Sequence, residues 1–184
     1  MILLTTSLRP TNRMRTLCHD LARSIPKVVR INRGKLNLDG IAEKALEFNA
    51  DRVIIVDRWK GGPGKIKLFQ AGPEGLILVP PLIFVRGIRL QRELEGVRAK
   101  PVRSLTITTP HEKSPQVAKI AGSLSRFLNV PASTMDVAAS RYGATMHVSS
   151  GASDQIQITF MLLPQAMEIG PRITISHVVW EAQK

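Results

Sequence analysis

The order of predicted elements repeats along the chain, and this repeat constrains the fold more than any other feature. Residues 2–10, ILLTTSLRP, and residues 104–115, SLTITTPHEKSP, each predict a strand that ends in Thr-Thr and leads through a proline-bearing loop into a helix. Pro26 ends the first helix and Pro131 ends the second. The sequence therefore predicts an internal duplication of an α/β unit.

Apolar periodicity supplies the remaining elements. The first and third helices have apolar stripes at helical spacing, namely Met14, Leu17, Cys18, Leu21, Ala22 and Ile25, then Val117, Ile120, Ala121, Leu124, Phe127 and Leu128. A second helix, capped by Asn37 or Asp39, has the predicted inner face Leu38, Ile41, Ala42, Ala45 and Leu46. Its counterpart in the second half is a weak pattern near 135–140. Strands are predicted over 27–32, 52–59, 65–71, 75–79, 82–90, 144–149, 155–163 and 172–180, with turns at 72–75 and 164–171.

These elements predict an α/β fold of two similar halves, each a mixed sheet with packed helices. We expect one domain with a basic N-terminal half over 1–92, a charged linker over 93–101 and a C-terminal half over 102–184.

The charge of the chain favours a polyanionic partner. Its 184 residues carry 26 Lys and Arg against 14 Asp and Glu, a net charge of +12. Residues 1–100 hold +10 of that charge and residues 101–184 hold +2, which predicts a binding face in the first half. The longest apolar run, 76–85, is too short to cross a bilayer, and the chain has one cysteine. We expect a cytoplasmic protein with no membrane partner.

The segment 27–35, KVVRINRGK, is the strongest candidate for binding. It places four cations within nine residues and has no carboxylate among them. Strand alternation puts Arg30 on the face opposite Ile31, and a turn at Gly34 follows. Arginine forks and open backbone N–H groups suit a phosphate or a base edge. A solvated, basic strand end is the alternative, and in either case we expect the side chains here to be exposed.

Signatures of catalysis are missing from the sequence. The glycine run at 61–65 has the wrong spacing for a phosphate-binding loop, and no Ser or Thr follows Lys65. Cys18 lies on an apolar helix stripe, which indicates a buried hydrophobe rather than a nucleophile. The four histidines are scattered and show no metal-binding spacing. Trp59 and Trp180 both end strands, where they could be half-buried or could stack on a base. We therefore expect no enzyme activity, cofactor or metal.

Several segments resemble the Brix-domain family of ribosome-biogenesis proteins. TTSLRPTNRMR at 5–15 is similar to the family's Thr-Thr-Ser…Pro-Ser-x-Arg opening, and RINRGK at 30–35 is closely similar to the family's own segment. DRVIIVDRWKGGPGKIKL at 51–68 and GLILV at 75–79 extend the match, and beyond residue 79 only the order of elements agrees. The chain is most similar to compact archaeal relatives of the branch that acts beside a guide snoRNA in the small-subunit processome. VPPL at 79–82 departs from the family's His-x-Pro-x-Gly-Pro segment, so no role of that histidine carries over.

The resemblance implies two halves that each resemble the anticodon-binding domain of certain aminoacyl-tRNA synthetases. It also implies an RNA-binding factor that acts on pre-rRNA folding or RNA–RNA pairing in small-subunit assembly. Pre-rRNA or rRNA would be its partner, and guide RNA and other ribosome-assembly proteins are further candidates. A tRNA-binding accessory module and a protein-interaction scaffold remain alternatives.

The expected RNA contacts are basic residues of the first half. Three of them rank first: Arg30, Arg33 and Lys35. The next group is Arg9, Arg13, Lys60, Lys65 and Lys67, in which Lys65 and Lys67 share one face of a strand. A further row at helix-like spacing consists of Arg86, Arg89 and Arg92.

Overall fold

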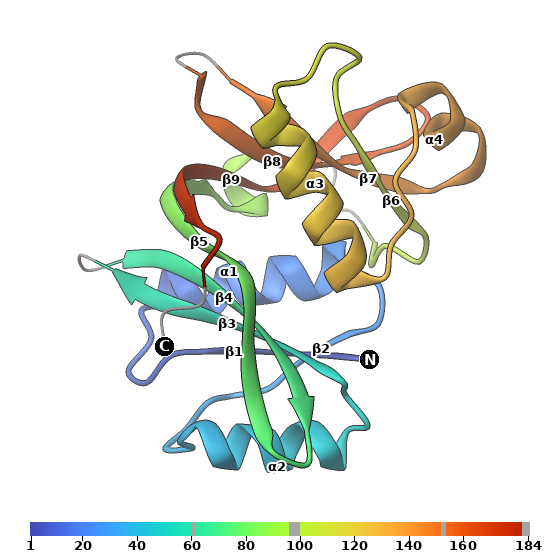
Figure 1. The fold of residues 1–184 in the computed structure, drawn as a ribbon. Helices are drawn as coiled ribbons and strands as arrows, with labels where there is room; N and C mark the ends of the chain where they lie inside the picture. The colour runs from blue at the N-terminus through green and yellow to red at the C-terminus, as the bar shows by residue number, and fades with distance from the viewer. Residues whose placement is uncertain (60–61, 96–99, 152–153, 182–184) are drawn as a thin grey trace. The chain divides into compact units, whose positions relative to one another are not determined.

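The computed structural model describes residues 1–59, 62–95, 100–151 and 154–181 (Figure 1). The chain forms two compact units. Unit 1 consists of Met1–Ala22, Lys27–Val85 and His177–Lys184, and unit 2 consists of Arg23–Pro26 and Arg86–Ser176. Within the expected linker 93–101, residues 96–99 lie outside the described residues.

The sheet of unit 1 combines parallel and antiparallel strands. Its strands are β1 (Ile2–Thr6), β2 (Val28–Arg30), β3 (Arg52–Trp59), β4 (Gly62–Gly72) and β5 (Gly75–Arg89), in the order β2-β1-β3-β4-β5. β1 pairs in parallel with β2 and β3, whereas β3, β4 and β5 pair antiparallel. The predicted strand at 52–59 and the predicted hairpin across 72–75 are confirmed.

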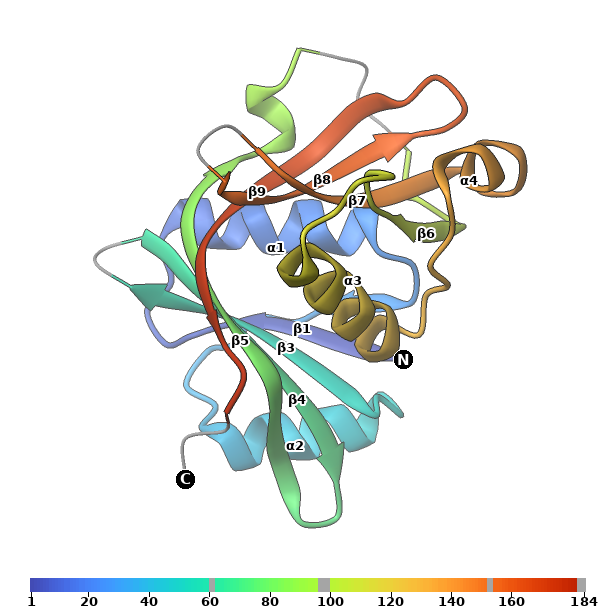
Figure 2. The same ribbon diagram turned by 45° about the horizontal axis from the view of Figure 1, so that its top comes forward.

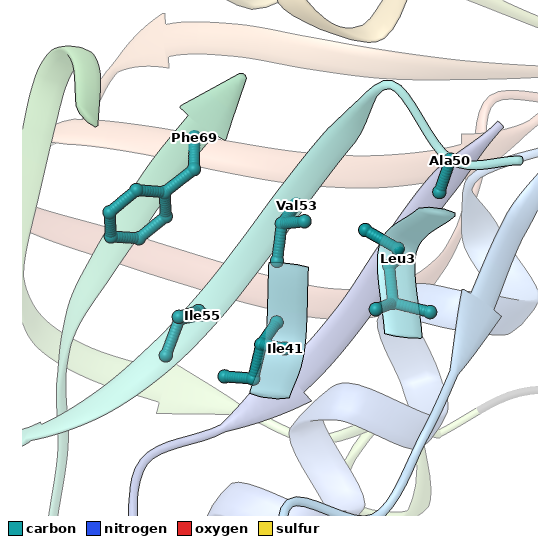
Figure 3. Close-up of a cluster of buried hydrophobic side chains, with 7 residues drawn as sticks. Leu3, Ile41, Ala50, Val53, Ile55 and Phe69 are labelled. Atoms are coloured by element: carbon teal, nitrogen blue, oxygen red, sulfur yellow. The ribbon is translucent and has the colours of Figure 1, made fainter. Parts of the chain in front are cut away.

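Two helices cover opposite faces of this sheet, α1 (Asn12–Ser24) and α2 (Leu38–Glu47) (Figures 1 and 2). The Oδ1 atom of Asn37 accepts a hydrogen bond from the Gly40 amide at 2.8 Å, so Asn37 is the N-cap of α2. Side chains of β1, α2, β3 and β4 meet in one buried cluster (Figure 3). Its members are Leu3, Ile41, Ala45, Ala50, Val53, Ile55 and Phe69.

The predicted inner face of α2 is right in the middle of the helix and wrong at its ends. Ile41, Ala42 and Ala45 are buried, but Leu38 is 48% exposed and Leu46 is 56% exposed. The sheet contacts the stripe through Ile41 and Ala45, and the first and last turns of this ten-residue helix lie beside that contact. Helical periodicity identifies a stripe of residues, but the extent of the packed surface decides which of them are buried.

Unit 2 has the same order of elements as unit 1. It contains β6 (Leu105–Thr108), α3 (Pro115–Leu128), α4 (Met135–Arg141), β7 (Ala144–Ser150), β8 (Ile156–Leu162) and β9 (Met167–Val179), after a short 3-10 helix (Gln91–Glu93). β6 pairs in parallel with β7, and β7, β8 and β9 pair antiparallel. Ala132, which follows α3, makes a parallel bridge to Ile107, in the place that β2 takes beside β1. Figure 2 shows α3 against one face of this sheet.

Strands β5 and β9 contain prolines within the strand and do not end at them. The pairing of β4 with β5 shifts register opposite Pro80 and Pro81, and the pairing of β8 with β9 shifts register beside Pro171. Irregular pairing tolerates a residue that has no N–H group. The turn predicted at 164–171 is present but shorter: it covers residues 163–166, and its predicted second part is wrong because β9 already begins at Met167. No helix among the described residues combines the length and the hydrophobicity needed to cross a membrane.

Two substitutions on α2 test this assignment of its inner face. Ile41→Ala should lower the free energy of unfolding by about 2–5 kcal/mol, because Ile41 is fully buried in the cluster of unit 1. Leu46→Ala removes a similar side chain from the same helix, but it should change the free energy of unfolding by less than about 0.5 kcal/mol because Leu46 is exposed. Urea unfolding of both variants makes the comparison, and equal losses would contradict the packing described here.

Candidate nucleic-acid interface

Parallel pairing in unit 1 collects three chain segments at one edge of its sheet. Because β2, β1 and β3 run in the same direction, the segments that follow them emerge at the same side. We call this the carboxyl edge and define it as residues 7–11, 31–37 and 57–59, together with Arg30, the last residue of β2. The Ser7 amide donates to the Val56 carbonyl at 2.8 Å, so the first loop is bound directly to β3.

The side chain of Arg33 lies inside this edge, so the expectation that it is exposed is wrong. Arg33 is 8% exposed. Its Nε donates to the Leu36 carbonyl at 2.6 Å, and its Nη1 lies 3.4 Å from the Thr6 carbonyl. The guanidinium thus closes its own turn and joins that turn to the end of β1. Gly34, at φ 55°, provides the left-handed backbone that this turn needs.

Asp57 balances the buried charge. Burial lowers the pKa of the Arg33 guanidinium, and the nearby Asp57 carboxylate opposes that shift. Partial burial alone would raise the pKa of Asp57, but the hydrogen bond and charge of Lys67, with the Arg58 amide and the Ser7 hydroxyl, hold it below its ordinary value. Lys67 Nζ lies 2.6 Å from Asp57 Oδ2. Arg33, Asp57 and Lys67 therefore form one charged network, and Lys67 is paired within the protein.

Exposed cations remain at the surface of the same edge. Arg9, Lys35 and Arg58 are exposed, and Arg30 is half-buried at the end of β2, where its Nη1 donates to Asn32 Oδ1 at 3.1 Å. Arg58 Nη1 donates to the Arg9 carbonyl at 3.3 Å, and Arg9 itself has a left-handed φ of 52°. A loop with this uncommon backbone is held in place by the side chain of the neighbouring segment.

The predicted contacts do not form a single surface. Arg30 pairs with Leu4 and so lies on the α1 face, whereas Lys67 pairs with Ile55 and lies on the α2 face, as does Lys65. Arg13 is exposed in the first turn of α1. Lys60 lies outside the described residues.

The expected basic row of Arg86, Arg89 and Arg92 is not helical. Arg86 and Arg89 belong to strand β5, and Arg92 belongs to the 3-10 helix. All three are exposed and belong to unit 2.

Net charge is shared equally between the two units. Unit 1 holds fourteen Lys and Arg with eight Asp and Glu, and unit 2 holds twelve with six, so each carries +6. The contrast of +10 against +2 between the first 100 residues and the rest disappears because Arg23 and residues 86–100, which together carry +4, belong to unit 2.

The corresponding edge of unit 2 carries a neutral network. Thr108 Oγ1 lies 2.8 Å from Thr145 Oγ1 and 2.9 Å from His147 Nδ1. Burial lowers the pKa of His147, which favours its neutral form. Thr108 and Thr145 are buried, so these hydroxyl groups support the structure and are not open to a substrate.

The thiol of Cys18 lies inside unit 1. Burial raises the pKa of the Cys18 thiol to about 12, although the charge of Arg30 opposes this, and its side chain is fully buried as the sequence predicted. Within the described ranges, no three His, Cys, Asp or Glu side chains lie close enough to hold a metal ion. Trp180 is half-buried.

Sequence reasoning missed two residues of the carboxyl edge, Asp57 and Arg58. Both directly follow Val56, the last residue of β3 that pairs with β1. Charged residues at the carboxyl ends of parallel strands are a recognisable signal, because ligands bind at that edge in many α/β proteins. The signal was present in RVIIVDRW, but it requires knowing which strands are parallel.

Several curated proteins that are similar to this chain carry the same name, although no protein-family model matches the chain. A probable Brix domain-containing ribosomal biogenesis protein of Methanopyrus kandleri is 35% identical over 131 residues, which cover 69% of this chain and 66% of that protein. The protein of the same name in Pyrococcus horikoshii is 37% identical over 112 residues, covering 59% of this chain and 50% of that protein. The chain thus spans between half and two thirds of the length of these relatives.

Two solved structures share the fold. A probable ribosomal biogenesis protein from Aeropyrum pernix superposes with a TM-score of 0.76 at 25% identity, over 95% of this chain and 94% of that one. Mil, an archaeal Imp4-like protein, superposes with a TM-score of 0.67 at 16% identity, over 98% and 100%. The fold is therefore the mixed α/β fold of archaeal Imp4-like proteins. The chain belongs to the Brix-domain family, as its sequence segments indicated.

Because Arg33 is buried and Lys35 is exposed, we predict that replacing these two residues changes the free energy of unfolding by different amounts. Arg33→Met should lower the free energy of unfolding by about 1–3 kcal/mol, because the carbonyls of Leu36 and Thr6 lose a donor and Asp57 loses a neighbouring charge. Lys35→Met, at an exposed position, should change it by less than about 0.5 kcal/mol. Urea unfolding at neutral pH compares the two, and a larger effect at Lys35 would refute the assignment of Arg33.

A second prediction concerns pH and His147. Because its pKa in the folded protein is below the ordinary value of 6.5, the unfolded chain binds more protons under acidic conditions. The stability present above about pH 6.5 should therefore decline as the pH falls through that value towards the folded pKa. His147→Gln should reduce this decline when unfolding is measured between neutral and mildly acidic pH. His111→Gln, at an exposed position of the same unit, is the control and should leave the decline unchanged.

Proposed function

We propose that this chain is an RNA-binding ribosome-biogenesis factor that contacts pre-rRNA or rRNA through three exposed cations and one half-buried cation of the carboxyl edge. The observation that carries the proposal is the convergence of Arg9, Arg30, Lys35 and Arg58 on one edge of the sheet of unit 1. The names of its relatives supply the biological setting.

The chemistry of the edge suits a nucleic-acid backbone. Three of the four cations are arginines, whose planar forks bind phosphate through paired hydrogen bonds. Arg33 and Asp57 hold the loops from within, so the exposed cations sit on an ordered backbone. Such contacts supply affinity and position with little dependence on RNA sequence. Binding of this kind would favour correct folding or pairing of pre-rRNA strands without chemical catalysis.

A common origin of the two units fits the same proposal. Each has a strand, a helix, a short parallel strand or bridge, a second helix and an antiparallel set of strands. We propose that they arose by internal duplication of a module resembling the anticodon-binding domain. The cationic edge of one copy and the neutral threonine–histidine network of the other would then represent divergence of function.

The salt dependence of RNA binding tests the edge. Each lost phosphate contact should reduce the slope of log affinity against log salt concentration by roughly 0.7 to 0.9. Arg30→Ala and Lys35→Ala should each produce that reduction with an rRNA fragment, and the double variant should produce about the sum of both. The measurement is fluorescence anisotropy of labelled RNA across a salt series.

Lys44→Ala is the matched control. Lys44 lies in the last turn of α2, where it pairs with Glu47, so this variant removes one positive charge from unit 1 away from the carboxyl edge. Its slope should equal that of the wild type. An unchanged slope in the double variant would remove the edge from the proposal, and a clear preference for tRNA over rRNA fragments would favour a tRNA-binding module instead.

A further inference from the structure

Two rows of side chains with different character run along helix α2. Residues four apart on a helix lie one above the other on the same side. The apolar row consists of Leu38, Ala42 and Leu46, and the acidic row next to it consists of Asp39, Glu43 and Glu47. Both leucines are exposed, at 48% and 56%, and all three carboxylates are exposed as well. Exposed apolar and acidic surface therefore lie side by side on this helix.

The sheet of unit 1 buries only the middle of the apolar row. Ala42 is buried together with Ile41 and Ala45, and Ile41 points into the cluster of Figure 3. Leu38 in the first turn and Leu46 in the last turn are left exposed. The distance at which two helices pack depends on the side chains between them. A small residue between two exposed leucines leaves room for another helix to approach α2.

Helix α2 is acidic within a basic unit. It contains three carboxylates and one lysine, a net charge of −2, whereas unit 1 as a whole carries +6. Helices α1 and α3 each carry +2, and α4 is neutral. The acidic row repels the phosphates of RNA and attracts lysine and arginine side chains. The charge of α2 therefore fits a cationic protein segment and does not fit RNA.

The acidic row is unfavourable for the helix that carries it. Carboxylates four residues apart repel each other, and Glu47 lies in the last turn, where the helix dipole also disfavours a negative charge. Lys44 Nζ lies 2.6 Å from Glu47 Oε2 and balances that charge. Repulsion of Glu43 by its neighbours in the row opposes helix formation, and cations of a bound partner would relieve it.

We propose that the two rows of α2 bind an amphipathic helix of a protein partner, whose apolar face is bordered by lysines and arginines. Ridges of residues four apart on one helix pack into the grooves between such ridges on another. Because α2 is about 15 Å long, a partner helix of roughly ten residues covers both rows. A second copy of this chain fits less well, since its own α2 is acidic. The site goes beyond the proposed RNA contacts and does not use any of their residues.

Three fluorescein-labelled helical peptides of about fourteen residues are the probes. The first peptide has leucines four apart along one side and lysines in the neighbouring row. In the second peptide, glutamates replace the lysines, and in the third, serines replace the leucines. Alanine and glutamine fill the other positions because they favour a helix. Fluorescence anisotropy measures the affinity of each peptide for the full chain.

Two substitutions on α2 test the two rows separately. Leu46→Ala shortens the apolar row, and Glu43→Lys reverses one charge of the acidic row. Ile77→Ala is the matched control for the first, because Ile77 is 60% exposed in β5 of unit 1, outside α2. Glu112→Lys, which reverses an exposed carboxylate of unit 2, is the matched control for the second.

Helix docking predicts a specific pattern of affinities. The wild type should bind the first peptide roughly tenfold or more tightly than the other two. Leu46→Ala should weaken that binding roughly 3- to 10-fold, because the exposed part of Leu46 no longer becomes buried against the peptide. Glu43→Lys should weaken binding of the first peptide and strengthen binding of the glutamate peptide. Both control variants should bind the first peptide like the wild type.

The outcomes also separate this site from the carboxyl edge. Leu46→Ala should keep the wild-type affinity and salt slope with the rRNA fragment, and a reduced slope would overturn the proposal. Failure of the wild type to bind the first peptide would overturn it, and so would equal losses in the control variants. Equal affinity for the serine peptide would show attraction by charge alone and would overturn helix docking. Dimerisation of the wild type that is lost in Leu46→Ala would overturn the protein partner and assign the surface to a second copy of this chain.

Discussion

Parallel pairing of β1 with β2 and β3 is the constraint on which the carboxyl edge of unit 1 depends. It joins three strands by backbone hydrogen bonds between two helical layers, and it makes the three following segments emerge together. The burial of Leu3, Val53 and Ile55 beneath α2 keeps those strands in register. The cations of the edge owe their proximity to this pairing, since those from different segments are more than twenty positions apart in the sequence.

The charged residues of this edge have two separate roles, one structural and one at the surface. Arg33 is buried, and its guanidinium stabilises the loop by donating to backbone carbonyls while Asp57 balances its charge. Arg9, Lys35 and Arg58 point from the ordered loops towards solvent. A buried cation without Asp57 would carry a large desolvation cost, and an unbalanced edge would repel its own exposed cations. The carboxylate of Asp57 therefore supports the cationic surface of this edge, because it balances the charge of the buried Arg33.

The division of the chain into units changes how its composition is interpreted. Strands β5 and β9 each begin in one unit and end in the other, so neither unit is a continuous stretch of sequence. Net charge is +6 in each, so net charge does not distinguish the two units, and residues distant in the sequence share a unit. His177 illustrates this, because it is close to the C-terminus in sequence yet stacks on Phe84 in unit 1.

The sequence by itself determined most elements of the fold. Apolar spacing, the cap at Asn37 and the turn at Gly34 act over a few residues, so a local pattern is enough to predict them. Family segments within residues 2–79 also identified the Brix domain. Only the tertiary structure decided that Arg33 is buried, that Arg30 and Lys67 lie on opposite faces of the sheet, and how the charge divides between units. Burial and proximity depend on which distant strands pair, and a one-dimensional pattern of residue types does not contain that information.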